Sequence, residues 1–470
     1  MGGRKEWGAA GDFDIPKALI YFERVKRAWV FGLLLAIINF TACRRPSVKD
    51  SGPNIILILI DALRMDRLND YGHDRKTNPF LAEFGKRGIR FTNAYSQSSH
   101  TKISVASLLT GLIPPHHGVR QADFPWEEEK TRYFSDSLST KLTTLAEVLQ
   151  KKGYRTAGFV TNPHLKSFFG FSQGFEDYTY IDLPQGKARP LNNEIVRWLK
   201  QGEKDPFFLY VHYMDIHAPY RPSPVYRNLY TRKKDFVAYG SNGPYPGTVD
   251  REAVQYTKDC YDAQINYWDD CFRELVRHME EQGWTDNTVF VILSDHGEEF
   301  YDHGGFGHGL TLYQEQLHIP LYMVGPGRIL PAQVRADRVE VIDIFPTLCG
   351  LAGQNVKGLG LQGKNLLASK GMSPDAFHYA ETCMGKAPVS VQTAGFKLIY
   401  NVAEKSFELY DLKNDRKESA NIISRKPAWA RAGQKELLEL MASRKPGIQS
   451  SKREVSRETM DTLRSLGYVR

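Results

Sequence analysis

The stretch Asn54–Ile60 (NIILILI) is, after its first residue, an unbroken run of branched apolar side chains, and the polar Asp61 follows it. Such a run is typical of a strand in a parallel sheet, because helices cover both faces of the sheet and both sets of side chains are buried. The sequence therefore predicts a central strand with Asp61 at its carboxyl end.

Other apolar runs along the chain end in the same way. They are RTAGFV (155–160) before Asn162, FFLYVHY (207–213) before Asp215 and His217, and TVFVIL (288–293) before Asp295 and His296. Helical patterns such as Leu142–Lys152 lie between them, so the order predicts a wound α/β sheet with its ligands at the carboxyl ends of the strands. A single Asp after a strand is commonly a helix cap or turn residue, but so many strand ends of this kind favour a site.

A candidate nucleophile lies in the segment Ser98–Ser104 (SSHTKIS), which leads into a short helix that Gly111 stops. The N-terminus of a helix favours an anion, so an oxyanion could be held there while Thr101 attacks. A divalent metal bound by Asp61, Thr101, Asp295 and His296 would lower the pKa of the hydroxyl. Simple N-capping by Thr101 or Ser104 is the alternative. We also predict that the adjacent Lys102 binds substrate.

A glycine-rich loop, Asp302–Gly309 (DHGGFGHG), carries His303 and His308. Neutral imidazoles suit a transition metal or proton transfer. We expect His217 and His308 to contact the transferred group or protonate the leaving oxygen. We expect three further residues to help bind the substrate: Asn162, Asp215 and His303. A second metal held by Asp215, His217 and His308 is left open, as is the alternative that the loop is only a flexible surface loop.

The composition is that of an ordinary globular protein. Of 470 residues, 41% are hydrophobic and 25% charged, which excludes low-complexity disorder and a polytopic membrane protein. The formal net charge is +8, from 62 Lys and Arg against 54 Asp and Glu, and the basic residues are dispersed. This pattern favours a small anionic substrate or an anionic surface over a nucleic acid. Five cysteines argue against a disulfide framework.

The N-terminal segment has the features of an export signal. Arg24, Lys26 and Arg27 precede the apolar run Ala28–Ala42, which suits a signal h-region and is followed by Cys43. Phe40–Cys43 (FTAC) resembles the lipobox of bacterial lipoproteins, with Phe in place of the usual Leu. We therefore expect an exported protein, periplasmic or on the cell surface, that is tethered to the membrane; an uncleaved signal anchor and a buried core helix are the alternatives.

Taken together, the motifs resemble the sulfatase branch of the alkaline-phosphatase superfamily from Pro53 to about Asn421. Besides Asp61 and the nucleophile segment, the matching pieces are GYRTA (153–157), DIHAPY (215–220), SDHG (294–297) with His308, DIFPTL (343–348), KLIY (397–400) and ELYDL (408–412). The resemblance implies a metal-dependent ester hydrolase or transferase with an α/β core, a mixed or parallel sheet flanked by helices, and a small C-terminal antiparallel sheet.

The departures from the family pattern concern its reactive centre. Sulfatases carry Cys or Ser at the position of Thr101, in a Cys-x-Pro-Ser-Arg motif that is oxidised to formylglycine, and threonine cannot undergo that change. Val105 replaces the arginine of the motif, Ala62 replaces the second Asp of the metal pair, and Thr161 or Asn162 replaces a lysine. Threonine is instead the nucleophile of the nucleotide pyrophosphatase, phosphoethanolamine transferase and lipoteichoic acid synthase relatives.

The sequence therefore predicts cleavage or transfer of a phosphate-type ester through a covalent Thr101 intermediate, on a small anionic ester, a glycan or a lipid head group. Two carboxylates and one histidine favour Zn or Mn over Ca. The alternatives are a sulfatase that works without formylglycine and an inactive lipoprotein that binds an anionic glycan. The expected parts are an export segment (1–43), a linker (44–53), a catalytic domain (54–370), a C-terminal subdomain (371–425) and a basic helical tail (426–470).

Overall fold

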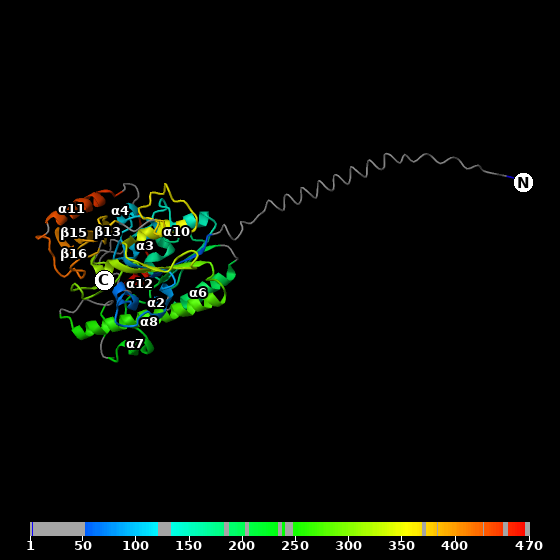
Figure 1. Cartoon of the computed structure of the whole chain (residues 1–470), viewed down its shortest axis with the longest axis horizontal. Coiled ribbons are helices and arrows are strands. Elements are labelled where there is room, and N and C mark those ends of the chain that lie inside the picture. Colours follow the sequence, from blue (N-terminus) through cyan, green and yellow to red (C-terminus); the bar gives the residue numbers. More distant parts are fainter. Residues whose placement is uncertain are drawn as a thin grey trace. The chain divides into compact units, whose positions relative to one another are not determined.

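The structure is a computed structural model that describes residues 2, 52–120, 133–182, 188–202, 206–233, 237–239, 248–368, 373–382, 384–425, 427–444 and 450–465 (Figure 1). The chain divides into the units Met1–Ser51 and Gly52–Arg470, and the fold is that of the second unit. The predicted export segment with Cys43 lies outside the described residues. None of the described helices is long and apolar enough to cross a membrane.

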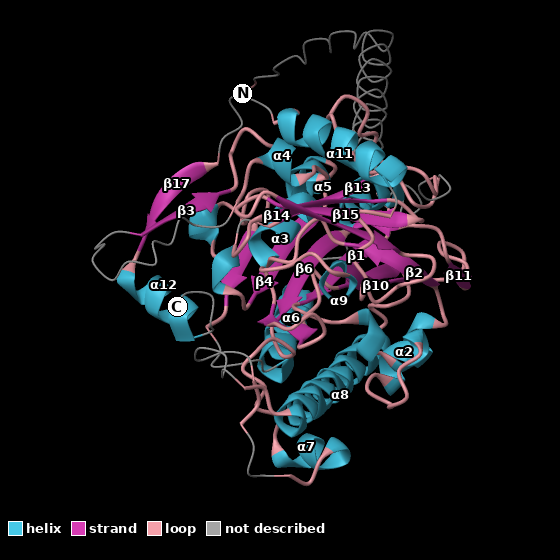
Figure 2. Cartoon of the chain, turned by 90° about the vertical axis from the view of Figure 1, so that its left-hand side faces the viewer, coloured by secondary structure: helices cyan, strands magenta, loops and turns pink. Residues whose placement is uncertain are grey.

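A mixed sheet forms the centre of the unit (Figure 2). Its strands are β1 (Asn54–Ile60), β2 (Ile89–Tyr95), β4 (Arg155–Val160), β5 (Asp177–Tyr180), β6 (Phe207–Tyr213), β7 (Thr288–Leu293), β10 (His318–Val324), β11 (Gln333–Arg335) and β12 (Val339–Glu340). Over the described residues the order is β11-β2-β10-β7-β1-β6-β4-β5, and β12 also pairs with β2. Strand β1 lies between β6 and β7 and runs parallel to both, whereas β10 is antiparallel to β7.

Both faces of the sheet are covered, as the run at 54–60 predicts. Ile55, Leu57 and Leu59 of β1 pack into one hydrophobic core, and the alternate isoleucines of the strand pack into a second core on the opposite face. The first core includes side chains of α3 (Thr101–Thr110), α5 (Leu145–Lys151), α10 (Ile344–Leu351) and α12 (Arg457–Ser465). The second includes side chains of α2 (Pro79–Gly85), α6 (Ala188–Gln201) and α8 (Arg251–Glu281). Figure 2 shows α6 and α8 on one side of the sheet and α3 and α5 on the other.

A second, antiparallel sheet lies near the C-terminus. It consists of β13 (His378–Glu381), β14 (Pro388–Gln392), β15 (Phe396–Asn401) and β16 (Ser406–Asp411), in that order. Ala430 and Leu437 of α11 (Pro427–Ala442) pack on this sheet. The wound α/β core and the small antiparallel sheet that the sequence predicts are thus confirmed.

The helical prediction for the tail is confirmed at α11 and at α12 (Arg457–Ser465), but not between these helices. Between α11 and α12 lies a strand, β17 (Ser451–Val455), which pairs antiparallel with β3 (Tyr133–Ser137). The helical prediction is wrong for this segment, because the strand depends on a partner far away in the sequence rather than on local periodicity. Met460 and Leu463 of α12 are buried in the first core, so this part of the tail packs on the catalytic domain.

Five short α-helices and strands lie in the described loops around the sheet, besides several 3-10 turns. They are α4 (Pro114–His117), α7 (Pro224–Tyr230), β8 (Glu299–Phe300), β9 (Phe306–Gly307) and α9 (Gln314–Leu317). Strands β8 and β9 form a two-stranded hairpin that begins directly after Glu298 and ends directly before His308. This hairpin therefore connects two residues that belong to the site.

Candidate active site

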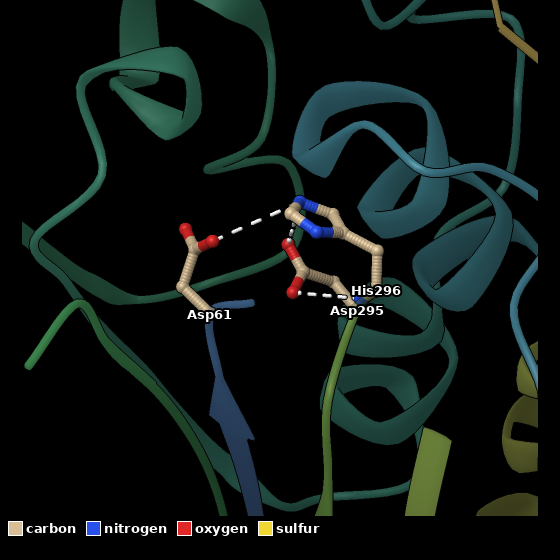
Figure 3. A group of neighbouring side chains, drawn as sticks. All are labelled: Asp61, Asp295 and His296. Atoms are coloured by element: carbon tan, nitrogen blue, oxygen red, sulfur yellow. Dashed lines mark hydrogen bonds and ion pairs between the residues drawn. The ribbon is translucent and has the colours of Figure 1, made fainter. Parts of the chain in front are cut away.

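Two carboxylates and one imidazole meet at the carboxyl edge of the central sheet (Figure 3). Asp61 follows β1, and Asp295 and His296 follow the neighbouring strand β7. All are fully buried, and one ligand atom from each lies within 4.8 Å of the others. Nε2 of His296 is 3.7 Å from Oδ1 of Asp61 and 3.5 Å from Oδ2 of Asp295. The parallel pairing of β1 and β7 brings these side chains together, as the sequence predicts.

Each carboxylate is held through one oxygen only. Oδ2 of Asp61 accepts a hydrogen bond from Nδ2 of Asn162 at 2.7 Å. Oδ1 of Asp295 accepts from the backbone N–H groups of Ala62 at 3.2 Å and His296 at 2.9 Å. Ala62 lies in the left-handed region (φ 58), a conformation that an alanine rarely adopts and that aims its N–H at Asp295. The other oxygens, Asp61 Oδ1 and Asp295 Oδ2, are buried without a hydrogen-bond partner.

The tautomer of His296 follows from its second nitrogen. Nδ1 lies 2.8 Å from the carbonyl oxygen of Gly297, which only accepts, so Nδ1 carries the hydrogen and the neutral ring keeps a lone pair on Nε2. That lone pair faces two carboxylate oxygens, which is unfavourable unless a cation lies between them. Burial, and then the charge of Asp295, raise the pKa of Asp61 well above its usual value. The oxygen, oxygen and nitrogen donors therefore fit a divalent metal ion.

Thr101 is the first residue of α3 and adjoins this cluster. Its Oγ1 lies 3.1 Å from Nε2 of His296, within hydrogen-bonding distance of that nitrogen. The preceding His100 caps the helix by accepting the N–H of Lys102 on Nδ1 at 3.3 Å, and α3 ends at Thr110, before Gly111 with φ 67. The apolar side chain of Val105 is buried in the first core, so it supplies no cation at the position where the sulfatase motif has an arginine. Thr101 is thus positioned as a fourth ligand and as a nucleophile.

Asn162 holds Asp61, so we expect the variant Asn162→Ala to bind Zn²⁺ about 10- to 100-fold more weakly than the wild type. Competition with a fluorescent chelator measures this affinity. Thr161→Ala is the matched control, because its hydroxyl donates to the backbone carbonyl of His212 and not to a ligand. Equal weakening in both variants would show that the whole segment, not the amide of Asn162, supports the site.

His217 and His308 lie beside the cluster. Their ring centroids are 4.9 Å apart, and the ring of His308 is 4.3 Å from that of His296. Nδ1 of His217 donates to the carbonyl of Ala218 at 2.6 Å, and Nδ1 of His308 donates to Glu298 at 3.2 Å, so each neutral ring keeps its lone pair on Nε2. Burial lowers the pKa of His217 to about 3 and also lowers the pKa of His308. Either ring must therefore take up a proton before it can protonate a leaving group.

The sequence analysis does not predict four buried residues that lie at the site: His100, His164, Tyr220 and Glu298. Glu298 accepts the hydroxyl of Tyr220 at 2.6 Å, and the rings of His100 and His164 are 5.1 Å apart. Burial lowers the pKa of both of these histidines, and the nearby His308 contributes to each shift. The available signal was proximity in the sequence, because His100 precedes Thr101, His164 follows Asn162 and Glu298 follows His296.

The structure places three predicted substrate-binding residues in other contacts. Lys102 is fully buried, and its Nζ donates to Ser135 and lies 3.7 Å from the ring centroid of Phe169. Asp215 accepts the first N–H of α6, that of Ala188, at 2.9 Å, and burial raises its pKa to about 7. The third residue, His303, is bound to the C-terminal part of the chain. Their role in substrate binding stays a prediction.

His303 contributes stability that depends on pH. Its Nδ1 lies 2.8 Å from Glu315 and its Nε2 lies 3.2 Å from the backbone oxygen of Glu418, whose carboxylate pairs with the buried Lys397 at 2.9 Å. Burial alone would lower the pKa of His303, but Glu315 and Glu418 raise it to about 9. Because the pKa is higher in the folded state, this stabilisation is complete below about pH 6.5 and is lost as the pH rises through 9.

We therefore expect His303→Gln to lower Tm clearly at pH 6 and hardly at all at pH 9.5. Thermal unfolding of both proteins across this range measures the effect. The variant His278→Gln is a control, because His278 pairs with Glu281 of the same helix and not with Glu315 or Glu418. A Tm difference for His303→Gln that stays constant with pH would contradict the charged contact.

Two buried carboxylates and an imidazole meet the hydroxyl of Thr101 at a helix N-terminus, on the carboxyl edge of a wound sheet. This arrangement agrees with an ester hydrolase of the alkaline-phosphatase superfamily, the class that the comparisons show. The Sulfatase family model matches residues 53–354, and a model described as N-sulphoglucosamine sulphohydrolase, C-terminal, matches residues 302–444. The chain belongs to the sulfatase family, whose members depend on a divalent metal ion.

Individual relatives are distant in sequence. An arylsulfatase of Clostridium perfringens is 24% identical over 439 residues, which cover 79% of this chain and 90% of the relative. A phosphonate monoester hydrolase of Agrobacterium radiobacter has a TM-score of 0.68 at 20% identity and covers 84% of this chain and 96% of its own. A protein solved with its substrate D-glucosamine-2-N,6-O-disulfate has a TM-score of 0.67 at 21% identity, covering 83% of this chain and 97% of its own. The solved structures support the shared fold.

Proposed function

We propose that the protein cleaves or transfers a phosphate-type ester through a covalent intermediate on Thr101. The observation that carries this proposal is the 3.1 Å contact between Oγ1 of Thr101 and Nε2 of His296, inside the cluster with Asp61 and Asp295. A hydroxyl is a weak nucleophile unless a base or a metal ion activates it. Here the hydroxyl lies against both a lone pair and the candidate metal ligands.

The reaction would proceed in two steps. The oxygen of Thr101 bonds to phosphorus, the bond between phosphorus and the ester oxygen breaks, and the alcohol leaves with the proton that Thr101 has given up. Nε2 of His217 or His308 would relay that proton, because each neutral ring carries a lone pair there. Water, or a second alcohol, then attacks the phosphothreonine, releases the phosphoryl group and restores the Thr101 hydroxyl. The first acceptor makes the protein a hydrolase and the second a transferase.

Asp61, Thr101, Asp295 and His296 would hold the metal ion. The ion would act as a Lewis acid and lower the pKa of the Thr101 hydroxyl. Two carboxylate oxygens, an imidazole nitrogen and a hydroxyl oxygen make a four-donor set that suits Zn²⁺ or Mn²⁺ better than Ca²⁺, which takes six to eight oxygen ligands. Asn162 orients Asp61 in this arrangement.

The residues at and near the nucleophile position favour phosphate-type chemistry. Threonine cannot form formylglycine, and the buried Val105 provides no cation where the sulfatase motif has an arginine. The structural similarity to a phosphonate monoester hydrolase agrees with such a substrate. Sulfate-ester hydrolysis is the second candidate, because the similar protein of Clostridium perfringens is an arylsulfatase.

Trapping the intermediate tests the proposal. The enzyme is mixed with a ³²P-labelled phosphodiester, quenched in acid and digested. We expect label on the peptide that contains Thr101, and none on that peptide in the variant Thr101→Ala. Label on another residue, or turnover without any labelled protein, would overturn the covalent Thr101 step.

We also propose that the protein is exported and tethered to the membrane through its N-terminal segment, on the basis of the apolar run Ala28–Ala42 and Cys43. Cell fractionation of the wild type and of Cys43→Ser tests the tether. Release of the variant into the soluble exported fraction is expected for a lipid on Cys43. Membrane association of both proteins would favour a signal anchor, and recovery of both in the cytoplasm would contradict export.

A further inference from the structure

Helix α7 is attached to the rest of the molecule through its two tyrosines. The hydroxyl of Tyr226 donates to the carboxylate of Asp270 at 3.0 Å, and the Tyr226 ring packs edge-on against Tyr267 with the centroids 5.3 Å apart. The hydroxyl of Tyr230 donates to the backbone oxygen of Lys76 at 3.1 Å. Because Tyr267 and Asp270 belong to α8, α7 lies on the outer side of α8, away from the central sheet (Figure 2).

A second face of α7 is apolar and exposed. Val225 is 74% exposed and Leu229 is 64% exposed. These residues are four positions apart in a helix, so their side chains lie side by side. A surface helix usually turns its branched apolar side chains toward the core, whereas α7 turns its tyrosines there. A single exposed apolar residue is common, but a neighbouring pair on a helix that is already attached by another face leaves apolar area for a partner.

Basic residues flank this apolar pair. The segment 221–233 (RPSPVYRNLYTRK) carries four basic residues and no acidic one. Arg221 precedes α7 by three residues, Arg232 follows it by two, and both are exposed. Neither arginine forms an ion pair with any residue that the structure describes, whereas Lys233 pairs with Glu252 at 2.7 Å. The surface therefore presents positive charge at both ends of the helix.

The combination of apolar and basic side chains matches a membrane surface that contains anionic lipids. In such a contact, apolar side chains enter the boundary between head groups and acyl chains, and basic side chains attract the lipid phosphates. A nucleic acid or an acidic glycan would engage the arginines but would leave Val225 and Leu229 in water. An apolar protein surface would cover these two residues but would leave the arginines without an anion. A layer of anionic lipid engages both.

We propose that α7 and its flanking arginines bind the surface of a membrane that contains anionic lipids. We name Arg221, Val225, Leu229 and Arg232 the α7 patch. The inference does not rest on the proposed function, because no residue of the α7 patch belongs to the candidate active site. It is also separate from the proposed tether, since α7 belongs to the unit Gly52–Arg470. A contact of this size is reversible and adds to a second attachment rather than replacing it.

Sedimentation with lipid vesicles tests the proposal on residues 52–470, without the N-terminal segment. Both hydrophobic cores and all described strands lie in this unit, so it contains the groups that stabilise its fold. The vesicles consist of phosphatidylcholine alone or of phosphatidylcholine mixed with phosphatidylglycerol. We expect binding to the mixed vesicles to be at least about 10-fold stronger, and to weaken as NaCl is raised from about 0.05 to about 0.5 M.

Two double variants separate the apolar contact from the charged one. Val225→Ser combined with Leu229→Ser should weaken binding to the mixed vesicles about 10-fold, because the apolar area that enters the lipid is lost. Arg221→Glu combined with Arg232→Glu should weaken it at least about 10-fold, because two attractive charges become repulsive.

Matched controls carry the same kinds of change at other exposed positions. Leu438→Ser alters a residue of α11 that is 58% exposed. Lys151→Glu combined with Lys152→Glu changes the net charge as much as the arginine variant does, at the C-terminal end of α5 and thus on the other side of the sheet from α8. Both controls should bind the vesicles like the wild type. All variants should keep a Tm close to that of the wild type, since the altered side chains are exposed.

Three results would overturn the proposal: no binding to the mixed vesicles, unchanged affinity in the serine variant, or an equal loss in a control. Unchanged affinity in the serine variant together with a loss in the glutamate variant would show that the segment attracts polyanions by charge alone. Self-association that the serine variant removes, without any binding to vesicles, would assign the apolar pair to a contact between two copies of the chain.

Discussion

Replacing Thr101 with alanine is expected to lower the rate of ester cleavage at least about 1,000-fold, because the variant has no oxygen to attack the ester and one ligand fewer for the metal. The helix should still form. His100 accepts the N–H of Lys102 and thus caps α3 independently of the Thr101 side chain. Steady-state kinetics of the purified variant, with Tm as the measure of folding, gives the result.

Thr101→Ser is the matched control for this experiment. Serine keeps the hydroxyl at the same position, so the variant should retain far more activity than Thr101→Ala. Comparable activity in Thr101→Ala and the wild type, at unchanged Tm, would rule out Thr101 as the nucleophile. Equal loss in the serine variant would point to the methyl group and hence to packing rather than to nucleophilic attack.

Removal of the divalent metal ion should abolish activity. The buried Asp61 Oδ1 and Asp295 Oδ2 lack hydrogen-bond partners and face the lone pair of His296, so without a cation the cluster is electrostatically unfavourable. We expect chelation to reduce the rate to background and also to lower Tm, since a ligand at 100 times its Kd stabilises the folded state by about 2.7 kcal/mol.

Metal replacement then identifies the ion. Zn²⁺ or Mn²⁺ should restore both the rate and Tm, with one ion bound per chain at this cluster, whereas Ca²⁺ should restore neither. The variant Asp295→Ala is the control, because its rate and Tm should no longer respond to added Zn²⁺. Full activity after exhaustive chelation, or recovery with Ca²⁺ alone, would contradict the assignment of this cluster.

The sequence predicts the fold and the centre of the site because both follow from local patterns. The run at Asn54–Ile60 alternates between two cores, and parallel pairing of β1 with β7 necessarily brings Asp61 close to Asp295 and His296. The helix that starts at Thr101 follows from its turn and stop signals. These features need only the period of a strand, the order of elements and the edge at which parallel strands end.

The outer contacts of the site could not be predicted in the same way. Lys102 lies next to the nucleophile in sequence, but its side chain turns to Ser135 and Phe169, and His303 binds groups contributed by the C-terminal part of the chain. Strand β17 forms only because β3 offers it a partner. Side-chain direction and long-range pairing are tertiary properties, and so is the left-handed conformation of Tyr301.

The most direct test of the central claim, that Thr101 defines a phosphate-type chemistry, compares rates on p-nitrophenyl sulfate, p-nitrophenyl phosphate and bis-p-nitrophenyl phosphate. Residues 52–470 are assayed with Zn²⁺ or Mn²⁺, beside the variant Thr101→Ala. We predict a preference for a phosphoester that disappears both in the variant and without metal. A preference for the sulfate would contradict the proposed Thr101 chemistry, because the sulfatase fold would then perform its usual reaction despite the threonine.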